Sequence, residues 1–233
     1  MAISKKPRNQ NAVVHHGAGT RRYRDKLAIL AVMILTALAM PVAPAGAAAD
    51  RSTSPVRTLP GGSAVGSSTL VRTDNGVSAT VETTELVPDN VVTLWWVVFN
   101  NPAACEHPIP GSACGPGDAH NSAPDGPQPS LLHAAGRIVS EDGTAEYGAH
   151  LRVGDTSRAL FGPGLVDARG AHVVLALKTH GPKIPELVSE QLSTFAGGCN
   201  NQDDVPPGAP QELVGTPGPN DCAEIQFTVH GSQ

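Results

Sequence analysis

Histidine is the side chain of this sequence that is best suited to metal chemistry. Imidazole nitrogens bind zinc or copper, but several of them must converge within ~2.1 Å of one ion. The sequence has no H-x-H or H-E-x-x-H spacing that would place two ligands on one element. The sequence therefore favours solvated surface imidazoles. Past residue 47 the chain carries seven histidines: His107, His120, His133, His150, His172, His180 and His230.

Strand geometry decides which of these histidines could share an ion. His172 and His180 belong to one expected strand, and eight residues at ~3.3 Å each separate them by roughly 26 Å. His133 and His150 instead fall on the same polar face of an expected hairpin, as diagonal neighbours ~7 Å apart at the backbone. His133 and His150 are therefore the candidate pair of metal ligands for zinc or copper, as the alternative to solvated imidazoles. Two ligands rarely complete a site.

Acidic and nucleophilic residues give weaker indications of chemistry. Glu141 and Asp142 are explained by a turn, because Asp-Gly pairs favour tight turns. Asp203 and Asp204 lie in NNQDDVPPG, where carboxylates could bind Ca²⁺, although the EF-hand spacing is missing. No G-x-S-x-G motif is present. We therefore assign no catalytic and no cofactor-binding residue, and expect a protein that is not an enzyme.

The four cysteines are expected to form disulfides. An even number of cysteines in an exported chain favours disulfides over a catalytic thiol. Three pairings are possible. Pairing within each Pro/Gly-rich connection closes the shortest loops, which favours Cys105 with Cys114 and Cys199 with Cys222.

Residue alternation predicts the strands that would position these groups. The dipeptide Asp142-Gly143 is typical of a type I′ turn, and it predicts a hairpin in which Leu132 faces Val153 and Ile138 faces Tyr147. Period-two alternation also predicts strands over residues 77–84, 173–179 and 223–230. The expected inward residues are Val77, Ala79 and Val81 in the first, Val173, Leu175 and Leu177 in the second, and Ala223, Ile225, Phe227 and Val229 in the third.

Residues 91–99, VVTLWWVVF, are apolar on both faces, which is typical of a central strand. Trp95 and Trp96 must point to opposite faces, and we expect the loop of residues 100–129 to cover one of them. Residues 185–195 carry an apolar stripe and predict one short helix. Many short strands with Gly/Pro connections favour an all-β fold, an antiparallel β-sandwich of Greek-key or jelly-roll type.

The first 47 residues have the features of a signal peptide. Basic residues precede an apolar run over residues 27–40, which is too short for a bilayer span, and small residues follow as a cleavage site before Ala48 or Asp50. Residues 48–68 are rich in Pro, Gly and Ser and predict a flexible linker. The β-sandwich domain would then span residues 69–233, with no membrane span after cleavage.

The net charge and the predicted compartment limit the kinds of partner that are expected. The net charge is −5; residues 1–47 contribute +6, which leaves −11 for the exported part. An acidic surface repels phosphate backbones, so nucleic acid is not an expected partner. The export signal and the cysteines predict a secreted or periplasmic protein of the cell envelope.

Three segments, WWVVFNNPAAC, GDTSRALFGPG and LKTHGP, resemble exported bacterial proteins over most of the domain. The outline is also similar to small secreted β-sandwiches of the CHRD type, and neither resemblance implies a known activity. The chain lacks the paired-histidine strand of copper/zinc superoxide dismutases. We therefore expect a non-enzymatic module that binds an extracellular or envelope ligand through residues 100–129 and 199–222, with metal binding by surface histidines as the alternative.

Overall fold

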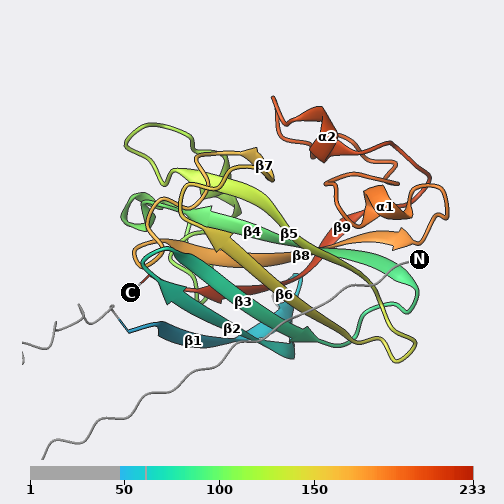
Figure 1. Ribbon diagram of the computed structural model, residues 1–233, viewed down its shortest axis with the longest axis horizontal. Helices are drawn as coiled ribbons and strands as arrows, with labels where there is room; N and C mark the ends of the chain where they lie inside the picture. Colours follow the sequence, from blue (N-terminus) through green and yellow to red (C-terminus); the bar gives the residue numbers. More distant parts are fainter. Residues whose placement is uncertain (1–47, 61, 233) are drawn as a thin grey trace, which may run out of the picture. The chain divides into compact units, whose positions relative to one another are not determined.

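The computed structural model describes residues 48–60 and 62–232, and nearly all of their regular structure is antiparallel β-sheet (Figure 1). The predicted signal peptide lies outside these residues. Within them, no helix is long and apolar enough to cross a membrane. The strands are β1 (Asp50–Thr58), β2 (Ala64–Thr73), β3 (Gly76–Thr83), β4 (Asn90–Phe99), β5 (Pro129–Ile138), β6 (Ala145–Arg152), β7 (Ala159–Phe161), β8 (His172–Pro182) and β9 (Ala223–His230). The helical turns are η1 (Pro102–Ala104), η2 (Pro116–His120), α1 (Val188–Gln191) and α2 (Gln211–Val214).

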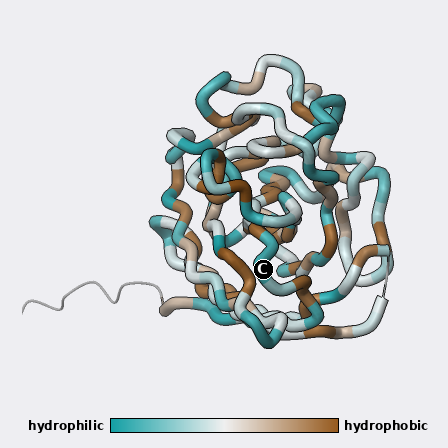
Figure 2. The backbone as a smooth tube through the Cα atoms, turned by 90° about the vertical axis from the view of Figure 1, so that its right-hand side faces the viewer, coloured by the Kyte–Doolittle hydropathy of each residue, from teal (hydrophilic) through white to brown (hydrophobic). Residues whose placement is uncertain are grey.

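The strands form one sheet in the order β6-β3-β2-β1-β9-β8-β4-β5-β7. Its two halves meet where Arg57 and Thr58 of β1 pair with Phe227 and Gln226 of β9. The sheet curls at this junction so that both halves enclose one interior, and Figure 2 shows the chain arranged around it. The prediction of an all-β, antiparallel, sandwich-like fold is therefore confirmed. The helix expected over residues 185–195 is present as the shorter α1, and a second short helix, α2, was not predicted.

Alternating side chains of both halves fill the main core. Its largest members include Leu70, Leu94, Trp96, Tyr147 and Leu175, and each is almost fully buried. The inward residues predicted for β3 and β8 all belong to this core: Val77, Ala79, Val81, Val173, Leu175 and Leu177. Period-two alternation thus identified the core face of these strands correctly.

The prediction of a flexible linker over residues 48–68 is wrong. Residues 50–58 form β1, which pairs with β2 from Asp50↔Arg72 to Arg57↔Ala64. β1 adds one buried apolar side chain, Val56, to the core, so small residues can fill its other positions. Within the described strands, no ladder bond joins Pro55 to β9, and such a free edge tolerates proline. The domain therefore begins at β1.

The predicted hairpin is also wrong. A turn is present at these residues, but it is not the predicted type I′ turn, because Gly143 has a positive φ and Asp142 does not, and Gly143 N–H donates to Ser140 O. In the described part of the chain, no ladder joins β5 to β6: β5 pairs with β4 and β7, and β6 pairs with β3. Gly143 has a positive φ of 74°, and the carboxylate of Asp142 accepts hydrogen bonds from Ser140 and Thr144. Alternation separates the two faces of a strand, but it does not determine which strand lies next to it.

The last strand, β9, faces the interior with its polar side, opposite to the prediction. Gln226, Thr228 and His230 are buried, whereas Phe227 and Val229 are only half-buried. Gln226 Oε1 accepts a hydrogen bond from Thr83, an inward residue of β3, at 2.5 Å. A buried polar residue is stable when its hydrogen bonds are satisfied. The partners on the other half of the sheet therefore determine which side of β9 is inward.

A second apolar cluster covers the outer face of β4, β5 and β8. Trp95 lies in this cluster and Trp96 in the main core, so the two rings point to opposite faces as predicted. The cover of Trp95 differs from the prediction. It is provided by residues 183–222, here called the cap, whose Phe195 ring lies 5.3 Å from the indole, and not by residues 100–129.

Arg72 closes one end of the main core. Its side chain is fully buried and donates hydrogen bonds to the backbone carbonyls of Ala168, Ala171, His230 and Gly231 at 2.7 to 3.2 Å. The connection before β8 and the end of β9 are thereby tied to β2. Burial lowers the pKa of Arg72, and the charges of Asp167 and Asp50 oppose that shift.

Replacing this guanidinium should be costly. We expect Arg72→Met to lower the free energy of unfolding by about 3 kcal/mol, because three buried carbonyls and one partly buried carbonyl lose a charged donor. Urea denaturation followed by circular dichroism measures the change. The matched control is Arg152→Met on the exposed side of β6, for which a change within about 0.5 kcal/mol is expected. Equal losses in both variants would show that the four contacts contribute nothing specific.

Candidate functional site

Both predicted disulfides are present. Cys105 is bonded to Cys114 and Cys199 to Cys222, so each long connection is closed by its own bridge. All four cysteines are thus oxidised, which rules out the catalytic thiol that was the rival interpretation. Disulfides persist in oxidising compartments, which agrees with an extracytoplasmic location.

The first bridged connection, loop 100–128, is organised around a buried carboxylate. Asp118 is fully buried and accepts hydrogen bonds from the backbone N–H groups of Glu106, His107 and Gly115. Its side chain also lies 3.2 Å from His107 Nδ1. Burial raises the pKa of Asp118, but these hydrogen bonds outweigh it and hold the pKa below its usual value.

A histidine of the sheet holds this loop against the β-structure. His172 Nε2 lies 2.7 Å from the hydroxyl of Ser112, which itself donates to the carbonyl of Cys114. Both residues are buried. The loop is therefore fixed by a disulfide, a carboxylate centre and an imidazole contact.

The cap is an ordered segment with its own hydrogen bonds. Its two sides run alongside each other, with Phe195 N–H donating to Leu213 O and Gly198 N–H donating to Thr216 O, both at 2.8 Å. A Cβ on Gly218 would lie 2.6 Å from the carbonyl oxygen of Gly198, so a glycine is needed for this close approach. Backbone hydrogen bonds and this close approach therefore hold the two sides of the cap together.

A chain of three side chains runs beneath the cap. Trp95 Nε1 donates to the hydroxyl of Thr93 at 2.8 Å, and that hydroxyl lies 2.9 Å from His180 Nε2. His180 Nδ1 lies 2.9 Å from the carbonyl of Gly197, which requires the proton to be on Nδ1. Thr93 therefore donates to Nε2 of a neutral imidazole. Burial lowers the pKa of His180 to about 4.

The structure does not bring the predicted metal pair together. His133 is buried under the cap, with its ring 5.1 Å from that of Trp95 and its Nε2 3.0 Å from Leu192 O. His150 is exposed on β6, and its Nδ1 lies 2.9 Å from Ser78 Oγ. Their proximity depended on a β5–β6 ladder, and β5 and β6 pair with other strands.

The sequence did not indicate that four of the histidines are buried. His133, His172, His180 and His230 are each at most 6% exposed, so they are not solvated surface imidazoles. The nitrogens of His230 lie 2.9 Å and 3.0 Å from the hydroxyls of Ser52 and Ser68. His172 and His180 follow the outward alternation of β8, but a second layer covers that face. The sequence offered one signal of this burial: the four histidines lie on strands with alternating polar and apolar residues, next to Gly/Pro-rich connections.

The described residues contain two groups of possible metal ligands. Within each group, the ligand atoms lie within 4.8 Å of one another. One contains His180, Cys199 and Cys222; the other contains Cys105, Cys114 and Asp118. The sulfur atoms in both belong to disulfides and are not thiolates, and thiolate is the form that binds metals. Among the described residues, neither group contains His133, His150, Asp203 or Asp204. We therefore assign no zinc, copper or calcium site.

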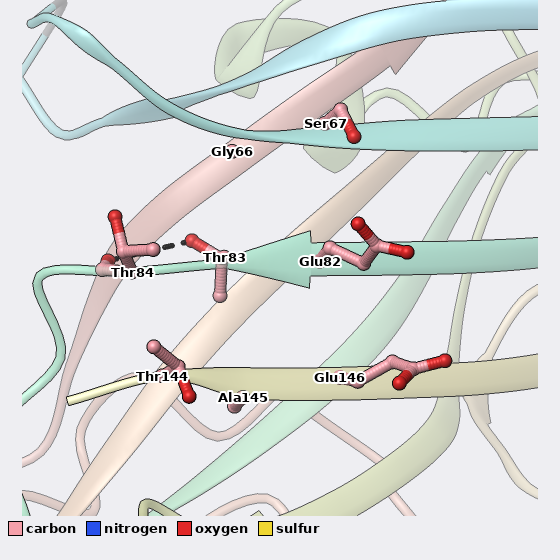
Figure 3. Close-up of a pocket in the computed structure, with 8 residues that line it drawn as sticks. All are labelled: Gly66, Ser67, Glu82, Thr83, Thr84, Thr144, Ala145 and Glu146. Atoms are coloured by element: carbon pink, nitrogen blue, oxygen red, sulfur yellow. Dashed lines mark hydrogen bonds between the residues drawn. The ribbon is translucent and has the colours of Figure 1, made fainter. Parts of the chain in front are cut away.

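A surface hollow of about 400 Å³ lies over β2, β3 and β6 (Figure 3). Glu82 and Glu146 face each other across neighbouring strands, and Ser67 and Thr144 add hydroxyl groups. Like charges directly opposite one another destabilise a sheet. The hollow is open and acidic, and an acidic pair alone does not define a ligand.

The Thr93 chain should be essential to stability. We expect Thr93→Val, which keeps the shape but removes the hydroxyl, to lower the free energy of unfolding by about 2 to 3 kcal/mol, because Trp95 loses an acceptor and His180 a donor. Urea titration followed by tryptophan fluorescence measures the loss. Thr80→Val on the exposed face of β3 is the matched control, with an expected change below about 0.5 kcal/mol. A small loss in Thr93→Val would contradict the proposed hydrogen bonds.

Asp118 should hold loop 100–128 together. In Asp118→Asn an amide group replaces one carboxylate oxygen and meets backbone donors, so we expect a loss of about 2 kcal/mol in local stability. Hydrogen exchange at the amides of Glu106 and His107 reports it as an acceleration of roughly thirtyfold. Asp125→Asn, an exposed change in the same loop, should leave both rates unchanged. Unaltered protection in Asp118→Asn would refute the role of the carboxylate.

Comparison with known proteins gives a structural likeness and no match in sequence. No family model matches the chain, and no curated protein matches it either. Among solved structures, the chain is similar to a Cu/Zn superoxide dismutase from Brucella abortus, with 18% sequence identity and a TM-score of 0.32. The similarity covers 77% of this chain and 99% of that protein. At this level of similarity nothing about function follows.

Proposed function

We propose that this protein is an exported, non-enzymatic binding or structural module that meets its ligand through loop 100–128 and the cap. The observation that carries the proposal is that both connections are fixed in one conformation by a disulfide and by buried hydrogen bonds. A loop that is ordered before binding loses less conformational entropy when the ligand arrives. Rigid scaffolds commonly present binding residues on such loops.

Loop 100–128 offers a specific surface for a ligand. A hollow of about 320 Å³ lies between Ala103, Glu106, Asn121 and Asp125. Glu106 and Asp125 are exposed, whereas Asp118 is turned inward and occupied by backbone donors. The exposed groups supply two carboxylates and an amide, which suit ligands that donate hydrogen bonds, such as glycans or amide-bearing envelope polymers.

The buried groups that resemble catalytic residues support a non-enzymatic role. His180 and His133 contact backbone carbonyls of the cap, and His172 contacts Ser112. These contacts account for the imidazoles as structural groups. The disulfides and the signal-peptide pattern of residues 1–47 support secretion or a periplasmic location.

A glycan array together with a pull-down from envelope material tests the proposal. We expect the disulfide-bonded protein to bind, and the double variant Glu106→Gln/Asp125→Asn to bind at least about tenfold more weakly, since two acceptors lose their charge. Glu82→Gln, in the hollow over β2 and β3, is the control and should bind like the parent. No binding in either assay, or equal weakening in both variants, would contradict the proposal.

A further inference from the structure

Two imidazoles of the sheet reach the inner backbone of the cap. His133 on β5 lies 3.0 Å from Leu192 O, and His180 on β8 lies 2.9 Å from Gly197 O. A carbonyl oxygen accepts and cannot donate, so each histidine carries its proton on the nitrogen that faces the cap. The contacts flank Trp95, whose ring the cap covers.

A second proton would affect the two imidazoles differently. His133 Nδ1 is buried and has no hydrogen-bond partner among the described residues, so a proton there would have no acceptor. His180 Nε2 accepts the hydroxyl proton of Thr93, whose oxygen already accepts the indole N–H of Trp95. Protonation of His180 would reverse this contact and turn the Thr93 hydroxyl towards Lys178 O, which lies 3.4 Å away. A buried donor without an acceptor is destabilising.

The charged groups around the two rings add to this effect. The charges of Arg158 and His180 lower the pKa of His133, and the charge of Lys178 lowers the pKa of His180. Lys178 is itself buried, with Nζ 4.2 Å from the centre of the Phe195 ring. Among the acidic groups, Glu224 and Asp204 raise the pKa of Lys178. The carboxylate of Glu190 in the cap accepts a hydrogen bond from the N–H of Thr216. The charges that act on the two imidazoles are thus positive.

The cap is joined to the rest of the protein differently from the strands. Cys199–Cys222 closes the cap on itself. The cap contacts the sheet through apolar side chains and the two histidines, and Gln191 Nε2 and Asn220 Nδ2 both donate to the carbonyls of His180 and Pro182 at the end of β8, at 2.7 to 3.2 Å. The strands below are joined by continuous ladders, such as those between β4, β5 and β8. Segments without such ladders open at lower free energy than core strands.

We propose that the cap is an acid-released cover: protonation of His133 and His180 lifts it from the sheet and uncovers the apolar face around Trp95, while the β-structure stays folded. The released surface would contain Trp95, Phe195 and Lys178. This inference rests on the cap contacts alone, and it stands or falls independently of the ligand proposed above.

The direction of the pH effect follows from proton binding. Burial lowers the pKa of both His133 and His180 to about 4, whereas a solvated imidazole in an open cap titrates at its ordinary value of 6.5. The open form therefore binds protons more readily, and closure weakens as the pH falls from 6.5 towards 4. At pH 4.5 each histidine favours opening on the order of a hundredfold more than at neutral pH.

Acrylamide quenching of the purified protein, with both disulfides formed, tests the release. The chain has two tryptophans, both about 1% exposed: Trp95 lies under the cap and Trp96 in the main core. Between pH 7.5 and 4.5 we expect the accessible fraction of fluorescence to rise from near zero to about half, with the far-ultraviolet circular dichroism unchanged. A fraction that stays near zero would overturn the proposal. So would full accessibility together with loss of the β-spectrum.

Paired variants identify the groups that respond. His133→Gln/His180→Asn keeps an N–H near each cap carbonyl but cannot be protonated in this range, so the rise in accessibility should disappear. His230→Gln is the control, because His230 is also buried but contacts Ser52 and Ser68 outside the cap. It should keep the rise. If the double variant does not fold, the quenching of the parent protein still decides. An unchanged rise in a folded double variant would refute the assignment.

Discussion

A buried, uncharged imidazole ties each peripheral segment of this protein to its sheet. His172 holds loop 100–128, His133 and His180 hold the cap, and His230 contacts serines of β1 and β2. A neutral imidazole both donates and accepts, so it can join two polar groups in an apolar setting without introducing charge. The cost is that burial disfavours the charged form of each ring and lowers the pKa of all four histidines.

The same constraint explains the polar interior around β9. The side chains of Gln226 and His230 find hydrogen-bond partners on β3, β2 and β1, across the junction where the two halves of the sheet meet. Arg72 adds four backbone contacts at the same end. Directional bonds therefore fix how the sheet closes, while apolar packing of Leu94, Trp96 and Tyr147 fills the space between the halves.

Local pattern was sufficient for the fold class, for the inward residues of β3 and β8, and for the cysteine pairing, because alternation and loop length are local quantities. It failed for β9, for the β5–β6 hairpin and for the linker, where partners distant in the chain decide the outcome. The metal pair His133 and His150 failed with the hairpin register. The burial of His180 depended on a cap whose position no pattern in β8 could indicate.

The bridge between Cys199 and Cys222 also determines what happens to a cut chain. It encloses most of the cap, including α2, with a sequence separation of 23 residues. A protease that cleaves one peptide bond between the two cysteines leaves both fragments covalently joined. β9, the strand that links the two halves of the sheet, would then remain attached to the rest of the molecule until the sulfurs are reduced.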